Sequence, residues 1–528
     1  MHPRRLLPLA LCGWLFACAA PAPRPGEVPA PPGKPAAPAR AASQTSPSQG
    51  TSLTVFFTTD EHGQLLPREK DGETVSGAVN LTYQLERLGY HAGDPGMLLL
   101  SGGDSWTGPA VSTYFQGAST VEVFNLLGYD AAALGNHDLD FGQATFTERA
   151  RQAHYPILAA NVHRSDGGKL AGLSSFVVVE VHGTRVGIVG LGNPRTPHIA
   201  LAENVAGLRF DPPGPALRET VPMARAAGAQ VVLALTHLCG PDLLELTPIA
   251  SELDVAVMLG GHCHEEMQAR KDGVLVVEGG HYLESVYRLV LRADPGSGRL
   301  LDAEVQRHPI TGAPAAAPSK LMRAVGAVVS RWEAKVQKVL GQVIGYSHRG
   351  VDLGPGLYAM VTDAWLAAIP QAQIALSNTG AFRQAIAPGS ITLADVLAVL
   401  PFENTLILTT VTGRQLLENL ACCGGAVAGL TYERKGGVVR AWLPDGKPLD
   451  PSARYRVLIN SFMYGGGDGY LFGEQDPNAE DTSIHWRDPV IDWIRRQHTS
   501  EARPLEALLD QRERFRPSPR PTEGAPAE

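Results

Sequence analysis

The sequence lacks three features, and each absence excludes a class of protein. It has no excess of positive charge, because 45 Lys and Arg stand against 53 Asp and Glu for a net charge of −8, whereas nucleic-acid-binding proteins usually carry a basic surface. Its six cysteines are too few for a scaffold held by disulfides. Beyond the N-terminal segment it has no apolar run of the roughly 20 residues that span a bilayer. The remaining composition, 44% hydrophobic and 19% charged over 528 residues, predicts a soluble globular protein of about two to four domains.

The N-terminal segment is typical of a bacterial export signal. Two arginines precede a short apolar run, Leu6–Phe16, which has the form of a secretory signal peptide. The run ends in a sequence that resembles the bacterial lipobox, which implies cleavage after residue 17 and a lipid on Cys18. The alternative is an ordinary signal peptide that is cleaved a few residues later.

Residues 18–50 predict a flexible tether behind this signal. They contain nine prolines and only one large aliphatic residue, Val28, and a segment with so little to bury stays extended. We therefore expect an exported protein, in the periplasm or at the cell surface, that contacts a membrane only through the lipid on Cys18. Residues 501–528, rich in Pro, Arg and Glu, predict a disordered C-terminal tail.

The body of the chain has the pattern of an α/β protein. From Leu53 onward, short β-rich runs alternate with helical stretches, and several runs are continuously apolar, as expected for strands buried on both faces. Residues 51–312 are predicted to form a first domain. Apolar residues at helical spacing predict a connecting helix within 313–340, and residues 341–500 predict a second α/β domain.

Five predicted strands are each followed by polar residues. These are Asp60 and His62 after the first, Asp104 after the second, Asn136 and His137 after the third, His237 after the fourth, and His262 and His264 after the fifth. Because ligand sites in α/β sheets form beyond the carboxyl ends of the strands, we expect these side chains to converge. Carboxylate, imidazole and amide ligands suit divalent metals such as Zn, Mn, Fe(II) or Co. With His137 set aside, seven ligands exceed the four of one tetrahedral ion, so the sequence predicts two ions.

The order of these motifs resembles that of the calcineurin-like metallophosphoesterases. In the second half, the segments Asn378–Arg383, Pro401–Asn404 and Phe462–Tyr470 resemble signatures of the 5′-nucleotidase family, which includes UDP-sugar hydrolases and 2′,3′-cyclic-nucleotide phosphodiesterases. The resemblance extends over about residues 53–475. It implies an N-terminal four-layer α/β/β/α metallophosphoesterase domain, joined by a helix to a C-terminal α/β substrate-binding domain.

The resemblance also implies a role for each matching residue. One metal would be held by Asp60, His62, Asp104 and His264, and a second by Asp104, Asn136, His237 and His262; the ions could be Zn, Mn, Co or Mg. A catalytic dyad would consist of His137 and Asp140. Substrate would be bound by Asn378 and Arg383 at the phosphate, Phe402 and Phe462 on either side of the base, and Asp468 at a ribose hydroxyl. For each of the two phenylalanines, the alternative is ordinary core packing.

The resemblance implies a phosphohydrolase that removes phosphate from nucleoside 5′-monophosphates, through a hydroxide that the metals activate. Hydrolysis of UDP-sugars, or of 2′,3′-cyclic and 3′-nucleotides, in the same site is the alternative within the family. A remote alternative is an inactive surface protein that only binds its ligand. The partner is in each case a small nucleotide and not a nucleic acid polymer, and the sequence predicts no particular oligomeric state.

Four cysteines lie in the body of the chain. Cys239 follows His237 by two residues and Cys263 lies between His262 and His264, so the two loops meet if the metal assignment is right. They are either a disulfide between the loops, formed in an oxidising compartment, or two small buried thiols. The adjacent pair at positions 422 and 423 is expected to remain as free thiols, because a bond between neighbours is strained.

Overall fold

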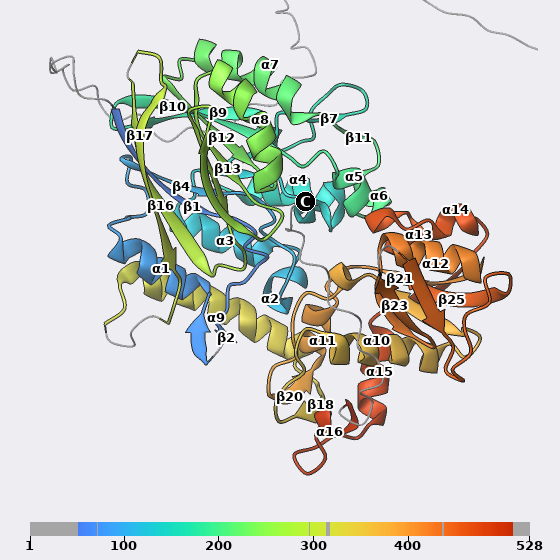
Figure 1. The fold of residues 1–528 in the computed structure, drawn as a ribbon. Helices are drawn as coiled ribbons and strands as arrows, with labels where there is room; N and C mark the ends of the chain where they lie inside the picture. Colours follow the sequence, from blue (N-terminus) through green and yellow to red (C-terminus); the bar gives the residue numbers. More distant parts are fainter. Residues whose placement is uncertain (1–50, 71, 295, 313–316, 436–437, 510–528) are drawn as a thin grey trace, which may run out of the picture. The chain divides into compact units, whose positions relative to one another are not determined.

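Two β-sheets lie face to face in the first half of the chain, and helices cover both outer faces (Figure 1). The computed structural model describes residues 51–70, 72–294, 296–312, 317–435 and 438–509. The seven-stranded sheet has the spatial order β17 (Leu300–Pro309), β16 (Ser285–Ala293), β1 (Thr51–Thr58), β4 (Met97–Ser101), β5 (Ala131–Ala133), β6 (Ile157–Leu158) and β8 (Leu173–Ser174). The six-stranded sheet has the order β14 (Glu266–Lys271), β15 (Val274–Gly279), β13 (Val255–Gly260), β12 (Val231–Thr236), β10 (Thr184–Leu191) and β9 (Phe176–Val181).

The core between the two sheets explains why these strands are apolar throughout. Side chains alternate between the faces of a strand, so Val55 and Phe57 of β1 pack toward the opposing sheet while Phe56 packs toward the helices. The outer face of the seven-stranded sheet is covered by α1 (Ala78–Arg87), α3 (Ala118–Leu127) and α4 (Gly142–Gln152), and that of the six-stranded sheet by α7 (Pro213–Ala226) and α8 (Gly240–Glu252). The predicted α/β/β/α arrangement is confirmed.

One long helix, α9 (Lys320–Leu340), follows this first half. The hydroxyl of Ser319 accepts a hydrogen bond from the Met322 N–H and caps its N-terminus. Its buried face includes Val325, Val329 and Val336, and it packs against α1 and α3. The helix predicted within residues 313–340 is therefore present, although residues 313–316 lie outside the described part of the chain.

The second half is built on a five-stranded sheet with the order β22 (Ala426–Ala428), β19 (Ile374–Ser377), β25 (Arg454–Asn460), β21 (Thr405–Thr412) and β26 (Glu480–His485). One face packs against α10 (Pro355–Ala368) and α15 (Asp488–Arg496), and the other against α12 (Gly413–Cys422) and the hairpin β23 (Thr431–Lys435) and β24 (Val438–Trp442). A further helix, α11 (Leu393–Val399), places Leu397 in the core cluster of the first half. The two halves thus share apolar contacts, and the boundaries of the two predicted domains stay a prediction.

The prediction that residues 501–528 form a disordered tail is wrong for residues 505–509. Leu505 is fully buried, and α16 (Glu506–Leu509) follows it. The buried Glu506 carboxylate accepts hydrogen bonds from the Ser347 hydroxyl and from the backbone N–H of His348, each at 2.7 Å, at the end of β18 (Val343–Ser347). One buried apolar residue and one carboxylate with two hydrogen bonds attach this segment to the fold. The polar composition of the segment gives no sign of this attachment. Residues 510–528, the predicted signal peptide, Cys18 and the predicted linker all lie outside the described residues.

The remaining elements are short. They are α2 (Ala110–Thr113), α5 (Thr196–Ile199), α6 (Ala202–Val205), α13 (Ser461–Tyr464), α14 (Phe472–Gln475), β2 (Arg68–Lys70), β3 (Glu73–Val75), β7 (Val162–Arg164), β11 (Leu208–Phe210), β20 (Gly389–Thr392), and the 3-10 turns η1 (His137–Leu139), η2 (Thr379–Ala381) and η3 (Gly467–Gly469).

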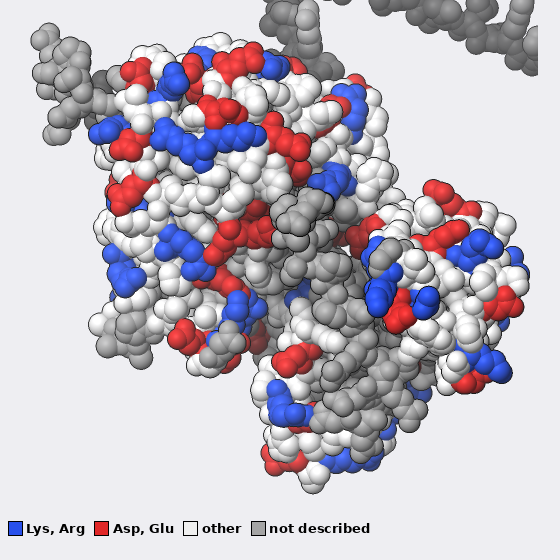
Figure 2. Space-filling view, in the orientation of Figure 1, with Lys and Arg blue, Asp and Glu red and all other residues white. Residues whose placement is uncertain are grey.

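Every helix within the described residues is too short or too polar to cross a bilayer. Acidic and basic side chains are interspersed over the face shown in Figure 2.

Candidate metal centre and substrate site

The carboxyl ends of the parallel strands bring the predicted ligands together. In both sheets the strands that carry them run parallel to their neighbours, β1 with β4 and β5 in one sheet and β12 with β13 in the other, so their ends lie at common edges. Two groups result, Asp60 with His62 and His264, and Asp104 with His237 and His262, and within each group the ligand atoms lie within 4.8 Å of one another.

Asp104 connects the two groups. Its Oδ2 lies 3.0 Å from His237 Nε2 and 4.0 Å from His62 Nε2. His62 Nε2 also lies 3.0 Å from His264 Nε2, and His264 Nε2 lies 3.6 Å from Asp60 Oδ1. The structure therefore gathers six of the seven predicted ligands as predicted, with Asp104 in the shared position.

The donor set fits divalent metal ions. The seventh predicted ligand, Asn136, has a buried side-chain oxygen without a hydrogen-bond partner among the described residues. A buried acceptor without a partner costs roughly 1–3 kcal/mol, and a metal ion would satisfy it. Oxygen and imidazole donors without thiolates suit Zn, Mn or Co, and Mg at the oxygen-rich positions.

Hydrogen bonds fix the imidazole tautomers for metal binding. His62 Nδ1 lies 2.8 Å from the Thr107 carbonyl oxygen, and His237 Nδ1 lies 2.9 Å from that of Gly102. Since a carbonyl oxygen can only accept, each Nδ1 donates, and Nε2 is the ring atom left to bind a metal ion. Both rings are fully buried, which holds this orientation.

Burial and charge set the protonation of these histidines. Burial, followed by the nearby Arg383 charge, holds the pKa of His62 well below its usual range, and burial with the charge of His237 lowers the pKa of His262 to about 3. Burial also disfavours the charged form of His237, but the Asp104 and Asp60 carboxylates outweigh it and raise its pKa to about 10. The Asp104 and Asp60 carboxylates thus favour a positive charge beside them, and a metal ion would supply it.

Backbone strain is concentrated at the same residues. Five ligand candidates adopt the left-handed conformation, with φ of 49° at Asp60, 47° at His62, 56° at Asp104, 79° at His262 and 60° at His264. Each such residue costs of order 1–3 kcal/mol, and such strain clusters at functional sites. Glycines make room around the ligands: a Cβ at Gly135 would lie 2.1 Å from Asp104 Oδ1.

The predicted dyad is formed. His137 Nδ1 lies 2.8 Å from Asp140 Oδ2, and the His137 backbone N–H donates to Asp104 Oδ1 at 2.7 Å. Burial disfavours the charged imidazole, but the Asp140 and Asp104 carboxylates outweigh it and raise the pKa of His137. With Nδ1 engaged by Asp140, Nε2 is the atom that can act on a substrate.

The predicted substrate residues divide into two sets. Arg383 Nη2 lies 3.0 Å from His62 Nε2, and the Phe402 ring stacks on His137 with 5.3 Å between ring centres, so both reach the metal centre. In the second set, Asn378 Nδ2 donates to Asp468 Oδ2 at 2.8 Å, and Asn378 Oδ1 accepts from Asn460 at 3.0 Å. The Asn378 amide therefore holds Asp468 in this structure.

Phe462 belongs to this second set. Its ring covers Gly467, where a Cβ would lie 2.4 Å from a ring carbon, so it packs on the loop that carries Asp468. Its backbone N–H donates to the side-chain oxygen of Asn404 at 3.2 Å. In the described part of the chain, Phe402 thus stacks on His137 and Phe462 lies on the Asp468 loop.

Sequence reasoning missed several supporting residues. The Asp138 carboxylate accepts backbone N–H bonds from Gly135, Ser105 and Asp104 at 2.8, 2.9 and 3.2 Å, and so joins the loops after β4 and β5. Tyr282 donates its backbone N–H to the Asp60 carbonyl oxygen at 2.7 Å and has its ring 5.2 Å from that of His62. Asp138 directly follows the predicted site residue His137 and could have been found there; Tyr282 has no sequence signal.

Both cysteine pairs are bonded. Cys239 and Cys263 form a disulfide with Cα atoms 5.3 Å apart, which confirms the disulfide interpretation. Cys422 and Cys423 are also bonded, so the prediction of free thiols there is wrong. Cys423 has already left the helical conformation, with φ −123° and ψ −17° at the end of α12, and this turn lets the two side chains meet.

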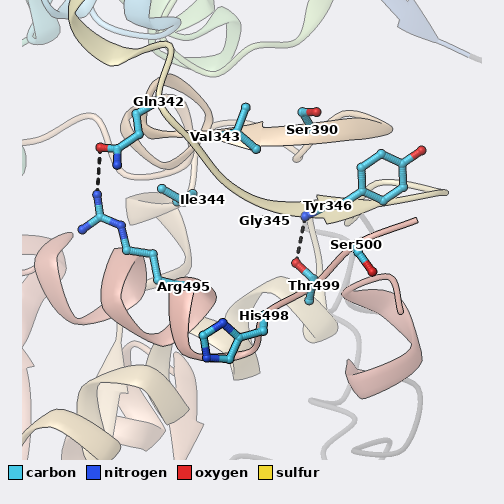
Figure 3. Close-up of a pocket in the computed structure, with 10 residues that line it drawn as sticks. All are labelled: Gln342, Val343, Ile344, Gly345, Tyr346, Ser390, Arg495, His498, Thr499 and Ser500. Carbon is cyan, nitrogen blue, oxygen red and sulfur yellow. Dashed lines mark hydrogen bonds between the residues drawn. The ribbon is translucent and has the colours of Figure 1, made fainter. Parts of the chain in front are cut away.

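A separate cavity of about 560 Å³ lies between β18 and the end of α15 (Figure 3). Gln342 accepts a hydrogen bond from Arg495 at 3.0 Å, and the Tyr346 backbone N–H donates to the Thr499 hydroxyl at 2.8 Å. The cavity contains none of the predicted site residues, so the metal centre remains the candidate site.

The chain is similar to known proteins over most of its length. Residues 346–474 match the family model of the 5′-nucleotidase C-terminal domain. The predicted resemblance to the 5′-nucleotidase family is thereby confirmed. The chain is 26% identical over 493 residues to the 5′-nucleotidase of Vibrio cholerae, covering 81% of this chain and 87% of the relative. It is 25% identical over 454 residues to the trifunctional nucleotide phosphoesterase YfkN of Bacillus subtilis, of which the match covers 30%.

A solved structure shows the same arrangement over both halves. The crystal structure of a 5′-nucleotidase precursor from Thermus thermophilus has a TM-score of 0.75 and 26% identity, and the match covers 85% of this chain and 97% of that one. The similarity in fold thus extends over most of both halves of the chain.

Proposed function

We propose that this protein is a dinuclear-metal phosphohydrolase that removes phosphate from nucleoside 5′-monophosphates. The observation that carries the proposal is the pair of ligand groups that share Asp104, next to a dyad and an arginine that face the same centre. The similarity to 5′-nucleotidases over both halves of the chain supports the nucleotide as substrate.

The metals would be held by Asp60, His62, His264 and Asp104 on one side, and by Asp104, Asn136, His237 and His262 on the other. Two such ions, when bound, neutralise a phosphate ester and lower the pKa of a coordinated water. The protein's own residues supply the remaining steps.

His137 is positioned to stabilise the charge that develops on the phosphoryl oxygens. Asp140 accepts from Nδ1 and favours the protonated ring, so Nε2 can donate a charge-assisted hydrogen bond. Arg383 can present two N–H donors to the same phosphate in a fork, which a lysine cannot do.

The second half would supply specificity. Phe402 and Phe462 are proposed to stack on the base, and Asp468 to bind a ribose hydroxyl. Asn378 would help either directly at the phosphate or by holding Asp468, as its 2.8 Å hydrogen bond to that carboxylate indicates. Phe402 already lies against His137, so this aromatic ring and the catalytic centre share one surface.

Hydrolysis of UDP-sugars or of 2′,3′-cyclic nucleotides is the second candidate. The name of the trifunctional nucleotide phosphoesterase of Bacillus subtilis indicates that one related protein carries more than one nucleotide phosphoesterase activity. An inactive binding protein is disfavoured, because all seven metal positions keep competent ligands.

Phosphate release from AMP, UDP-glucose, 2′,3′-cyclic AMP and p-nitrophenyl phosphate, with Mn, Zn, Co or Mg added, tests the proposal. AMP should have the highest kcat/KM. A higher value for UDP-glucose or the cyclic nucleotide would assign the protein to the second candidate, and no release from any of the four would contradict the enzymatic function.

We also propose export with a lipid on Cys18, and a division into domains at the helix within 313–340. The name "5′-nucleotidase precursor" of the Thermus relative indicates a processed protein. Incorporation of labelled fatty acid that is lost in Cys18→Ser tests the anchor. An unlabelled mature protein that begins after Ala20 would show ordinary cleavage instead.

A further inference from the structure

We infer that the Cys239–Cys263 disulfide is the positioning element of the metal centre, and that metal ions are held tightly only while this bond is intact. Cys239 follows His237 by two residues, and Cys263 lies between His262 and His264. One covalent bond therefore joins two loops that carry ligands of both metal groups. The inference rests on the proposed function in one respect, the presence of metal ions at these groups.

The loop that carries Cys239 is firmly attached to the core. Cys239 is 5% exposed, and the His237 backbone N–H donates to the Leu191 carbonyl oxygen at 2.9 Å. The next residue, Gly240, begins α8 and donates its N–H to the buried carboxylate of Glu278 at 2.6 Å. This side of the disulfide is thus a fixed point.

The loop that carries Cys263 is more exposed. Cys263 itself is exposed, and its neighbours His262 and His264 both adopt the left-handed backbone conformation. Gly261 donates to the Leu238 carbonyl oxygen at 3.1 Å, and His262 donates to the Asp60 carboxylate at 3.0 and 3.1 Å. The second contact uses a carboxylate that is itself a candidate ligand, so it competes with metal binding.

The disulfide consequently holds an exposed, strained loop to a buried, fixed one. Without it, His262 and His264 can relax toward negative φ, which turns their rings away from the centre. Metal binding then has to order the loop again, and this entropic cost is subtracted from the binding free energy of the ions. His264 depends on the bond more than His237 does, because its side chain is 26% exposed whereas that of His237 is fully buried.

The exposure of Cys263 also makes the bond reducible in the folded protein. A dithiol can attack the accessible sulfur, close its own disulfide and leave Cys239 and Cys263 as two thiols, a transfer of two electrons and two protons. The metal centre should therefore be stable in an oxidising compartment and weakened in a reducing one.

The test is Mn²⁺ binding to the purified chain, measured by calorimetry and by metal content after gel filtration. The variant is Cys239→Ser with Cys263→Ser, made together so that no free thiol can ligate the ion. The matched control is Cys422→Ser with Cys423→Ser, which removes the other disulfide from a helix end outside the metal loops.

Wild type and control should bind two Mn²⁺ per chain with equal Kd, and the Cys239→Ser/Cys263→Ser variant should show at least a tenfold higher Kd and lose metal on the column. Equal Kd and equal content in all three would overturn the inference. No binding by the oxidised wild type would instead contradict the metal centre itself.

If the double variant does not fold, as judged by circular dichroism, the Cys422→Ser/Cys423→Ser protein is reduced with a water-soluble phosphine, so that of the two disulfides seen in the described residues Cys239–Cys263 is the one that breaks. The phosphine is removed under anaerobic conditions and the two thiols are methylated, so that neither can ligate the ion. The same tenfold rise in Kd is expected, and its absence would overturn the inference.

Discussion

Arg383 donates to the atom of His62 that a metal ion would use. The guanidinium Nη2 lies 3.0 Å from His62 Nε2, whose lone pair is free because Nδ1 is bonded to the Thr107 carbonyl oxygen. The contact crosses from the second half of the chain to the first, and Gln384 adds a second one to Gln64 at 3.0 Å. When a metal takes this lone pair, the guanidinium must find another acceptor, and the substrate phosphate is the anion available.

Replacing Arg383 should therefore reduce stabilisation of the transition state more than it reduces metal binding. Arg383→Ala should lower kcat/KM for AMP by about 10²-fold, the usual loss on removing a charge-stabilising donor. Arg383→Lys should recover part of this, because it keeps the charge but loses the fork. Steady-state kinetics with Mn²⁺ titration as the control checks this, and an unchanged kcat/KM in Arg383→Ala would remove it from the site.

His137 should act on the substrate and not on the metals. His137→Ala should lower kcat by about 10²–10³-fold, the usual loss on removing a donor that stabilises charge in the transition state. Metal content should stay at two ions per chain, since Nδ1 of His137 is engaged by Asp140 and the ring belongs to neither ligand group. If the variant loses an ion instead, His137 is a ligand.

The aromatic side chains should determine selectivity for nucleotides. Phe402→Ala and Phe462→Ala should each lower kcat/KM for AMP by about 10-fold, since stacking on a base contributes about 1–3 kcal/mol. The rate with p-nitrophenyl phosphate should fall less in Phe462→Ala than in Phe402→Ala, because Phe462 packs on the Asp468 loop whereas Phe402 stacks on His137 of the dyad. The ratio of the two rates measures this, and an unchanged ratio in both variants would mean that the rings are core residues.

Stability of the metal-free protein should depend on Glu278. Burial raises the pKa of this carboxyl from 4.5 to about 7. Since the folded state binds the proton more tightly, the contribution of Glu278 to stability is greatest below pH 4.5 and is lost as the pH rises through 7, by roughly 3 kcal/mol.

Urea unfolding of wild type and Glu278→Gln between pH 4 and 8 measures this contribution. The unfolding free energy of wild type, relative to that of Glu278→Gln, should fall as the pH rises from 4 to 8. A difference that does not vary with pH would show that folding does not raise the pKa of Glu278.

The convergence of the ligand candidates was predictable from the sequence, because glycines and polar residues at the ends of apolar strands leave a local pattern. Gly135 and Asn136, for example, reflect both the space around Asp104 and the ligand itself. The layered fold was predictable for a related reason, since strands buried on both faces must be apolar throughout.

Other features depend on contacts between distant residues and left no such pattern. The engagement of Asn378 with Asp468, the stacking of Phe402 on His137 and the docking of Glu506 at the end of β18 each join segments far apart in the chain. The bond between Cys422 and Cys423 depends on a local turn at the end of α12 that composition does not predict.

The proposed hydrolysis of nucleoside monophosphates depends on two metal ions at one shared centre. It is tested most directly by AMP hydrolysis with the metal-free chain as Mn²⁺ is added in known equivalents. Phosphate release should be absent without metal and should rise to full activity at two equivalents, and Asp104→Asn should be impaired in binding both ions because Asp104 lies between the groups. Full activity without metal or at a single equivalent would contradict a two-metal mechanism.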